Sequence, residues 1–481
     1  YEVSDGMGGT FSMTGARVSY FDIDRRSRQI KDAGIAYNTI YDADGNVASD
    51  TSFLANNFAG FSRFCSSVLV EPLQFSGSRG IEDTIYFTGE EDGGFFNSVG
   101  GAEWALDVET GDLWAIPDMG RGAWENITEI DTGDDETVAF ILSDDTSPFD
   151  FNPDDAERDE EAPLFLYVGT KDPGGNFLEK NGLSGGKLYV WVADDPTILS
   201  PLDFNTSGTE AGSWVEIENL PNGTPSNDGS TGFDPYGYPT QGTLWLRARA
   251  LGAFGFSRPE DVATNPDDGT EAVLASTGVD TFAIGSSGDG ADTFGTIYTV
   301  KTDFSDLSAD LTIIYDGDAD VTARAIRSPD NLDWSEDGLI YIQEDKAEDD
   351  TLASMEPLFG PGATNLNEAG IIALNPDTGD TWRLANINRE VVLDESIPNK
   401  RSAVDTEAGN AGEWETSGII DVSEIFGKAP GSLFLFDVQA HGIEDQETFN
   451  PASRINDDDL VEGGQLVFIE QQPRGRGRGR R

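Results

Sequence analysis

Short alternating apolar runs, each opened by a glycine, recur along the chain. Five stretches follow this pattern: Gly186–Val192, Gly295–Val300, Gly338–Ile342, Gly431–Phe436 and Gly464–Ile469. They are rich in aromatic and β-branched residues, which favour β-strands, and the opening glycine is typical of a tight turn. We therefore predict a short strand in each stretch.

A second repeat predicts tight turns between strands. Leu106–Trp114 and Leu374–Trp382 both contain Thr-Gly-Asp between an apolar run and a tryptophan, which indicates two strands joined by a turn. Helical periodicity is weak, and a segment such as Pro259–Ala263 would form at most one or two turns of helix. Many short strands with an imperfect repeat predict an all-β protein, a β-propeller, with an array of β-sandwiches as the alternative.

We expect one propeller domain over residues 1–470, interrupted by long loop insertions. The insertions are an acidic stretch at about 143–162, a stretch rich in Gly, Ser, Asn and Pro at 200–241, and a third at 346–367. Residues 471–481 consist mostly of Arg and Gly, and this composition predicts a disordered tail.

The composition restricts the available chemistry. The chain has 89 Asp and Glu against 30 Lys and Arg, a net charge of −59, and a single His and a single Cys. The charge argues against binding to nucleic acid, and no apolar run approaches the roughly 18 residues needed for membrane insertion. A His-rich metal site and an intrachain disulfide are excluded. Abundant carboxylates favour hard cations such as Ca²⁺, and the acidity favours a location outside the cell.

The segment Phe256–Asp261 places a cation and an anion ligand side by side. Arg258 offers a planar fork of donors that matches phosphate oxygens. Glu260 follows across a proline of fixed backbone geometry, and its carboxylate could hold a metal. A site that binds metal and phosphate together needs this juxtaposition. A surface ion pair beside a strand start is the alternative interpretation.

Other carboxylates lie beside apparent strand ends. With Glu260, they make up the candidate metal ligands: Glu90, Glu91, Glu125, Asp144, Glu260 and Asp330. Glu125 follows a tryptophan that can shield it from water. Asp330 lies in a segment where Asx residues are also common turn formers.

Two further features stand outside this set. Asp42, Asp44, Asn46 and Asp50 alternate around a glycine, like the first half of an EF-hand calcium loop. The loop lacks the closing glutamate, so a turn with solvated acids is an equal alternative. His441 follows an apolar run and is interpreted as a hydrogen-bonded residue near a strand end.

In their order along the chain, these segments resemble the PhoX-type alkaline phosphatases, secreted calcium- and iron-dependent enzymes built on a β-propeller. Five motifs of the family resemble segments of this chain, namely Thr88–Glu91, Gly120–Glu125, Asp144–Asp145, Arg258–Glu260 and Pro329–Leu332.

The resemblance implies a six-bladed propeller that hydrolyses a phosphate ester substrate. It implies Ca²⁺ and Fe³⁺ held by Glu125, Glu260, Asp330 and one of Glu90 or Glu91. Arg258 would be the catalytic residue that stabilises charge on the transferring phosphoryl group, and no side chain is assigned as the nucleophile. The implied location is secreted, periplasmic or on the cell surface.

The chain departs from the family at one position. The family's iron-ligand cysteine corresponds to Gly89, while Cys65 lies in Phe61–Ser66 and is interpreted as a small buried apolar residue. Either the chain folds so that Cys65 reaches the metal cluster, or the iron site is altered or absent. The second case keeps an alternative function open: a non-catalytic calcium-binding propeller, acting as a structural cell-surface, filament or S-layer protein that self-associates through calcium.

Overall fold

The computed structural model describes residues 1–56, 59–93, 97–146, 148, 161–204, 208–278, 292–346, 357–389, 403–405, 409–441, 443–445 and 462–471. The chain divides into two compact units. Among the described residues, unit 1 contains residues up to Leu274 and Thr299–Thr312, and unit 2 contains residues 275–278, 292–298 and those from Ile313 onward.

Unit 1 begins with small pairs of strands and a larger sheet. The small pairs are β1 (Glu2–Ser4) with β2 (Thr10–Ser12), β4 (Ser19–Ile23) with β5 (Ile30–Ile35), and β3 (Thr14–Gly15) with β7 (Gly60–Phe61). The larger sheet has the order β6 (Thr39–Tyr41), β11 (Asp112–Ala115), β10 (Gly101–Asp107), β9 (Ile85–Gly89), β8 (Ser67–Val70), and β12 (Arg121–Gly122) also pairs with β10.

A nine-stranded sheet, most of which belongs to unit 1, follows. Its order is β13 (Trp124–Ile130), β14 (Thr137–Asp144), β16 (Leu164–Thr170), β17 (Lys187–Ala193), β18 (Thr209–Ile217), β23 (Ser308–Asp316), β22 (Thr296–Asp303), β21 (Glu271–Ser276) and β20 (Pro259–Thr264). The remaining elements are β15 (Glu161–Ala162) paired with β19 (Phe256–Ser257), helices α1 (Phe177–Lys180) and α2 (Gln241–Leu251), and short 3-10 turns at Thr51–Phe53, Pro117–Met119 and Pro201–Asp203.

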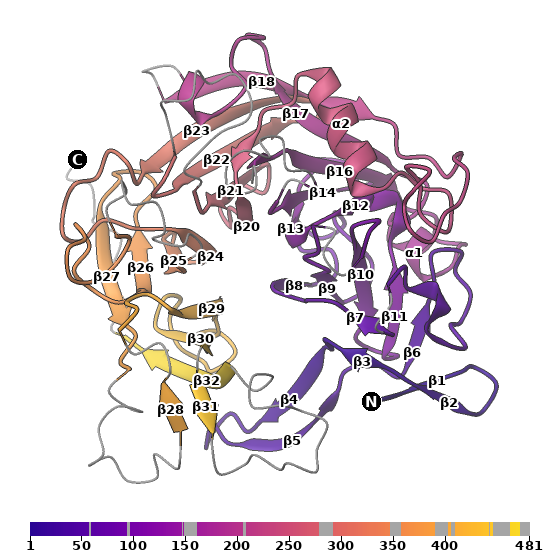
Figure 1. Ribbon diagram of the computed structural model, residues 1–481, viewed down its shortest axis with the longest axis horizontal. Coiled ribbons are helices and arrows are strands. Elements are labelled where there is room, and N and C mark those ends of the chain that lie inside the picture. The colour runs from indigo at the N-terminus through magenta and orange to yellow at the C-terminus, as the bar shows by residue number, and fades with distance from the viewer. Residues whose placement is uncertain are drawn as a thin grey trace. The chain divides into compact units, whose positions relative to one another are not determined.

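Unit 2 contains two antiparallel sheets and one short strand pair. The first sheet is the meander β24 (Pro329–Trp334), β25 (Ile340–Glu344), β26 (Gly370–Leu374), β27 (Thr381–Asn386); Figure 1 shows β24 to β27 in orange tones. The second has the order β29 (Trp414–Asp421), β30 (Leu433–His441), β32 (Glu462–Glu470), and β28 (Ala403–Asp405) pairs with β31 (Ile443–Asp445).

The predicted strands are confirmed. The five glycine-opened stretches correspond to β17, β22, β25, β30 and β32. Both Thr-Gly-Asp turns join paired strands, and their glycines, Gly111 and Gly379, have φ of 73° and 71°, a conformation that other residues adopt at a cost. The protein is all-β, as expected, and four-stranded meanders of this kind are the blades of β-propellers. The number of blades stays a prediction.

Helix α2 was not predicted from the sequence. This helix begins after Thr240, whose side chain accepts a hydrogen bond from the Thr243 amide, and ends at Gly252 with φ of 81°. Its buried face includes Leu244 and Ala248, and the exposed Leu246 between them obscures this helical spacing in the sequence. Conversely, Pro259–Ala263 lies in β20, because proline fits the first position of a strand, where no amide donor is required.

The expected insertions are described in part. Within 200–241, β18 lies between β17 and β23 in the sheet, and residues 218–240 contain no helix or strand. Most of 143–162, residues 347–356 and the tail after Gln471 lie outside the described residues. The extent of the single propeller domain therefore stays a prediction. Within the described parts of the chain, no helix is both long enough and apolar enough to cross a membrane.

Strand β10 separates two hydrophobic cores of unit 1. Trp104 and Leu106 pack into a cluster with Phe61, while Ala105 faces a second cluster that contains Trp124. Because side chains alternate along a strand, Glu103 shares the face of Ala105. It is fully buried, and neither carboxylate oxygen has a hydrogen-bond partner of good geometry among the described residues.

Glu103→Gln is expected to stabilise the protein at neutral pH, because the amide cannot ionise and so removes the cost of keeping this buried carboxyl protonated, about 1.4 kcal/mol for each unit by which its pKa is raised. Burial raises the pKa of Glu103 well above its ordinary value of 4.5, and the Trp104 amide only partly offsets this. The unfolded chain ionises at lower pH than the folded one, so the wild type loses stability as the pH rises above 4.5. Urea unfolding from pH 4 to 8 should show a shallower decline for Glu103→Gln, and parallel curves for both proteins would contradict the prediction.

Candidate active site

Each of the two proline–acid motifs, Pro259-Glu260 and Pro329-Asp330, directly follows a residue with a strained backbone conformation, which we call a strained corner. Arg258 and Ser328 have positive φ, 55° and 43°, which is unfavourable for residues other than glycine. Each directly precedes the proline that opens a strand, β20 or β24, and an acid, Glu260 or Asp330, holds the second strand position. Strained backbone persists where surrounding structure enforces it, commonly at functional sites. The same local geometry thus presents a carboxylate once in each unit.

A cluster of one thiol and two carboxylates lies in unit 1. One ligand atom each from Cys65, Glu91 and Glu125 lie within 4.8 Å of one another. Cys65 precedes β8 and Glu91 follows β9, and these strands are antiparallel, so the start of one and the end of the other meet at one sheet edge. Glu125 is the second residue of β13, which packs beside β8 and β9. We call these three residues the cysteine cluster.

Arg258 is held by two buried carboxylates. Its Nε donates a hydrogen bond to Asp145 Oδ1 at 3.0 Å, and its second terminal nitrogen lies 3.2 Å from a Glu260 carboxylate oxygen. The Arg258 side chain is 14% exposed and that of Asp145 is 1% exposed, so the pair is not a surface ion pair. Arg63 forms an ion pair with Glu91 and interacts electrostatically with Cys65, Glu125, Asp145 and Arg258. The Arg258 guanidinium lies beside the cysteine cluster, because its partner Glu260 has a carboxylate oxygen within 4.8 Å of one of Glu125.

Glu90 and Glu91 have different partners. Glu90 accepts hydrogen bonds from the Trp104 indole at 3.3 Å and the Ser62 amide at 3.4 Å. Burial raises the pKa of Glu90, and Arg121 opposes the increase. Neighbouring residues of an extended chain point to opposite faces, and only Glu91 joins the cysteine cluster. Of the two predicted alternatives, the geometry favours Glu91.

Asp144 supports the site without joining a cluster. Its Oδ1 accepts hydrogen bonds from the Ala123 amide at 2.7 Å and from the Gln241 amide nitrogen at 3.1 Å. Burial raises the pKa of Asp144 to about 8. Asp145, the next residue, binds Arg258. In this acid pair the first member therefore supports the β12–β13 connection, and the second faces the candidate site.

Unit 2 contains a second group, made only of carboxylates. Oxygens of Asp330, Asp345 and Glu415 lie within 4.8 Å of one another. Asp330 and Glu415 are the second residues of β24 and β29, and Asp345 follows the end of β25. We call these residues the carboxylate cluster. Our sequence analysis identified Asp330 but missed Asp345 and Glu415.

The missed residues repeat patterns that were recognised elsewhere. Trp414-Glu415 opens β29 as Trp124-Glu125 opens β13. Glu344-Asp345 ends β25 as Asp144-Asp145 ends β14, with the first acid again buried and bound. Comparing acid-bearing strand ends with one another could have found both residues.

The predicted calcium loop forms a hydrogen-bonded turn. Asp42 Oδ1 accepts hydrogen bonds from the amides of Asp44 and Asn46 at 3.0 and 2.9 Å. Asp50 caps the following 3-10 turn by accepting from the Ser52 amide at 2.8 Å. These bonds account for the turn, and a bound ion at this loop stays a prediction.

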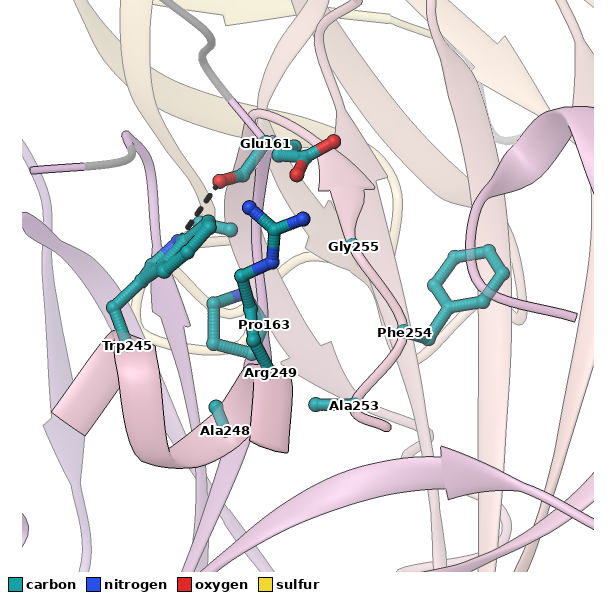
Figure 2. Close-up of a pocket in the computed structure, with 9 residues that line it drawn as sticks. Glu161, Pro163, Trp245, Ala248, Arg249, Ala253, Phe254 and Gly255 are labelled. Carbon is teal, nitrogen blue, oxygen red and sulfur yellow. Dashed lines mark hydrogen bonds between the residues drawn. The ribbon is translucent and has the colours of Figure 1, made fainter. Parts of the chain in front are cut away.

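A small pocket beside α2 is too small for a substrate. It lies between α2 and β15, and Figure 2 shows the Trp245 indole donating a hydrogen bond to the Glu161 carbonyl oxygen, a bond of 3.2 Å. The Arg249 guanidinium lies 4.7 Å from the Trp245 ring centroid. The cavity of about 10 Å³ has room for a single water molecule.

Comparison with known protein families identifies the chain. The family profile of alkaline phosphatase PhoX matches residues 125–387. The chain belongs to the PhoX alkaline phosphatase family. This confirms the resemblance that the motifs indicated. The matched range contains both strained corners, Arg258 and four candidate ligands, namely Glu125, Glu260, Asp330 and Asp345. The other three cluster residues, Cys65, Glu91 and Glu415, lie outside it.

A PhoX protein is among the solved structures that this chain resembles. The chain is similar to Pseudomonas fluorescens PhoX in complex with vanadate, a transition state analogue, with 16% identity and a TM-score of 0.46, over 77% of this chain and 57% of that one. It is also similar to the PQQ domain of pyranose dehydrogenase from Coprinopsis cinerea, with 11% identity and a TM-score of 0.23, over 68% of this chain and 85% of that one. A search of curated proteins found no match. The chain thus spans little more than half the length of the Pseudomonas protein.

The structure accounts for the departure from the PhoX motif at Gly89. A Cβ atom there would lie 2.5 Å from Trp124 Cβ and 2.9 Å from Glu103 Oε2, so a cysteine does not fit. Our interpretation of Cys65 as a buried apolar residue was wrong: it is half-buried and lies beside Glu91 and Glu125. A thiol is therefore present at this edge of the sheet, supplied from a different strand end.

Proposed function

We propose that this PhoX family member is a metal-dependent phosphatase that hydrolyses phosphate monoesters outside the cell. The observation that carries the proposal is the arrangement in unit 1. Arg258, whose guanidinium matches phosphate oxygens, is fixed by Asp145 and Glu260, and a Glu260 oxygen lies within 4.8 Å of an oxygen of Glu125 in the cysteine cluster. An anion-binding group and a cation-binding group together suit phosphoryl transfer.

The donor sets of the two clusters suit different metals. The cysteine cluster combines a thiolate with two carboxylates, and sulfur ligands favour iron over calcium. The carboxylate cluster offers only oxygens, which Ca²⁺ prefers. We propose Fe³⁺ for the first and Ca²⁺ for the second. When bound, such ions act as Lewis acids that polarise phosphoryl oxygens.

The chain's own residues bind and orient the substrate in this proposal. Arg258 would donate to the phosphate oxygens and offset the negative charge that builds up as the ester bond breaks. Asp145 and Glu260 keep the guanidinium plane in place, so little reorganisation is needed when the substrate binds. No side chain is assigned as the nucleophile.

Hydrolysis of p-nitrophenyl phosphate tests this function. With CaCl₂ and an iron salt supplied at alkaline pH, turnover of about 1 s⁻¹ or faster is expected, as for typical enzymes. Metal content should be measured on the same sample, and protein treated with EDTA is the control. If the fully loaded protein shows no hydrolysis, the phosphatase proposal fails. If chelation nevertheless dissociates assemblies, the structural calcium-binding alternative is supported.

A further inference from the structure

The single histidine of the chain lies at the end of β30, on the same face as a member of the carboxylate cluster. Glu415 of β29 pairs in register with Gln439 of β30. Residues two apart on a strand share a face, and diagonal neighbours across an antiparallel pair are within reach of long side chains. His441 is two residues beyond Gln439, so its ring lies diagonally across from Glu415.

The side-chain geometry agrees with this register. His441 Nε2 lies 3.8 Å from Glu415 Oε1, and the side chains are 33% and 8% exposed. Burial is the main cause that raises the pKa of Glu415 well above its ordinary value, and Asp345 adds to it by repulsion. The interaction with His441 acts in the opposite direction, while Asp330 adds further repulsion. With its Nε2 3.8 Å from Glu415 Oε1, His441 is placed to orient that carboxylate.

We propose that His441 is a positioning residue that holds the Glu415 carboxylate for cation binding by the carboxylate cluster. This inference rests on the proposed function in taking that cluster to be a metal site. His441 acts through Glu415, because its ring nitrogen lies near that carboxylate and does not belong to the group formed with Asp330 and Asp345. Partners that orient a metal ligand typically contribute 10- to 100-fold in metal affinity.

A single histidine makes a direct spectroscopic test practical. Protein labelled with ¹⁵N-histidine has one pair of ring-nitrogen signals, because His441 is the only histidine. Titration with CaCl₂ should shift these signals and saturate together with the calcium binding measured by calorimetry. In Glu415→Gln, which weakens the ligand that His441 orients, the shift should be lost. Unchanged ring signals at calcium saturation would overturn the proposal.

Two substitutions separate a positioning role from a bulk packing role. His441→Phe keeps a ring without a donor, and we expect the calcium dissociation constant to rise about 10- to 100-fold. His441→Gln keeps an N–H donor, and its affinity should stay within a few-fold of the wild type. Gln465→Phe, at an exposed position of β32, is the matched control and should bind calcium normally.

The outcomes remain decisive whatever the enzyme assay shows. Wild-type calcium affinity in His441→Phe would overturn the inference, as would equal losses in the Phe and Gln variants. Melting temperatures without calcium check that each variant folds, and if His441→Phe does not fold, the ring-nitrogen titration of the wild type decides. Because both readouts report calcium binding, a lack of phosphatase activity would count against the proposed function and leave this test intact.

Discussion

Arg258→Lys is expected to reduce hydrolysis of p-nitrophenyl phosphate by about 10²–10³-fold with little change in stability. Lysine keeps the positive charge that Asp145 and Glu260 require, but it lacks the planar fork that binds two phosphate oxygens. Arg258→Ala should lose activity too, and it should also destabilise the protein by roughly 3–5 kcal/mol, because Asp145 would remain buried without its partner. Steady-state kinetics and urea unfolding of both variants distinguish the two effects.

A matched substitution exists in the same unit. Arg79 also pairs with an aspartate, Asp131, at 3.0 Å, but its side chain is 27% exposed. Arg79→Lys should leave hydrolysis unchanged. If Arg258→Lys retains more than a tenth of the wild-type activity, the guanidinium of Arg258 does not contact the reacting phosphate in the wild type.

Cys65→Ser is expected to lose iron, and the rate of hydrolysis should fall by at least about 10²-fold as a result. A serine hydroxyl stays protonated and is a poor substitute for a thiolate. Glu91 and Glu125 remain, so the site would retain oxygen ligands only. Elemental analysis after reconstitution should show iron lost from the variant and calcium retained.

Cys65→Asp is the informative companion variant. It converts the cysteine cluster into an all-carboxylate group, which should favour calcium over iron. If Cys65→Ser binds iron like the wild type, Cys65 is not a ligand, and the assignment of iron to this cluster is wrong.

The strands were predictable because their signal is local. A glycine and an alternating run identify β17, β22, β25, β30 and β32 without knowledge of their partners, and Gly295, Gly338 and Gly431 have positive φ. The candidate site depends instead on pairing between distant segments. Cys65 approaches Glu91 because β8 and β9 are antiparallel neighbours, and no spacing in the sequence contains that information. The apolar residues that flank Cys65 in the sequence therefore suggested a core residue.

The same reason explains which members of the two clusters were predicted from the sequence. Arg258, Glu260 and Asp330 belong to short motifs with a proline, which are recognisable on their own. Asp345 and Glu415 stand in no such motif, and only the register of β24 with β25 and the packing of β29 bring them together. The choice between Glu90 and Glu91 depends on which side of the strand each side chain faces. The sequence does not give this orientation, whereas in the structure Glu90 accepts hydrogen bonds from Trp104 and Ser62 and so faces away from the cysteine cluster.

The repeated corner before β20 and β24 has a consequence for protein engineering. Apart from the proline and the acid that follows it, the two corners differ in sequence, yet both place a carboxylate at the second position of a strand. Designed metal sites need ligands on rigid backbone elements. A residue of positive φ, a proline and an acid form a compact module for the rim of a meander sheet, because the packing of the strand behind the corner does not have to change.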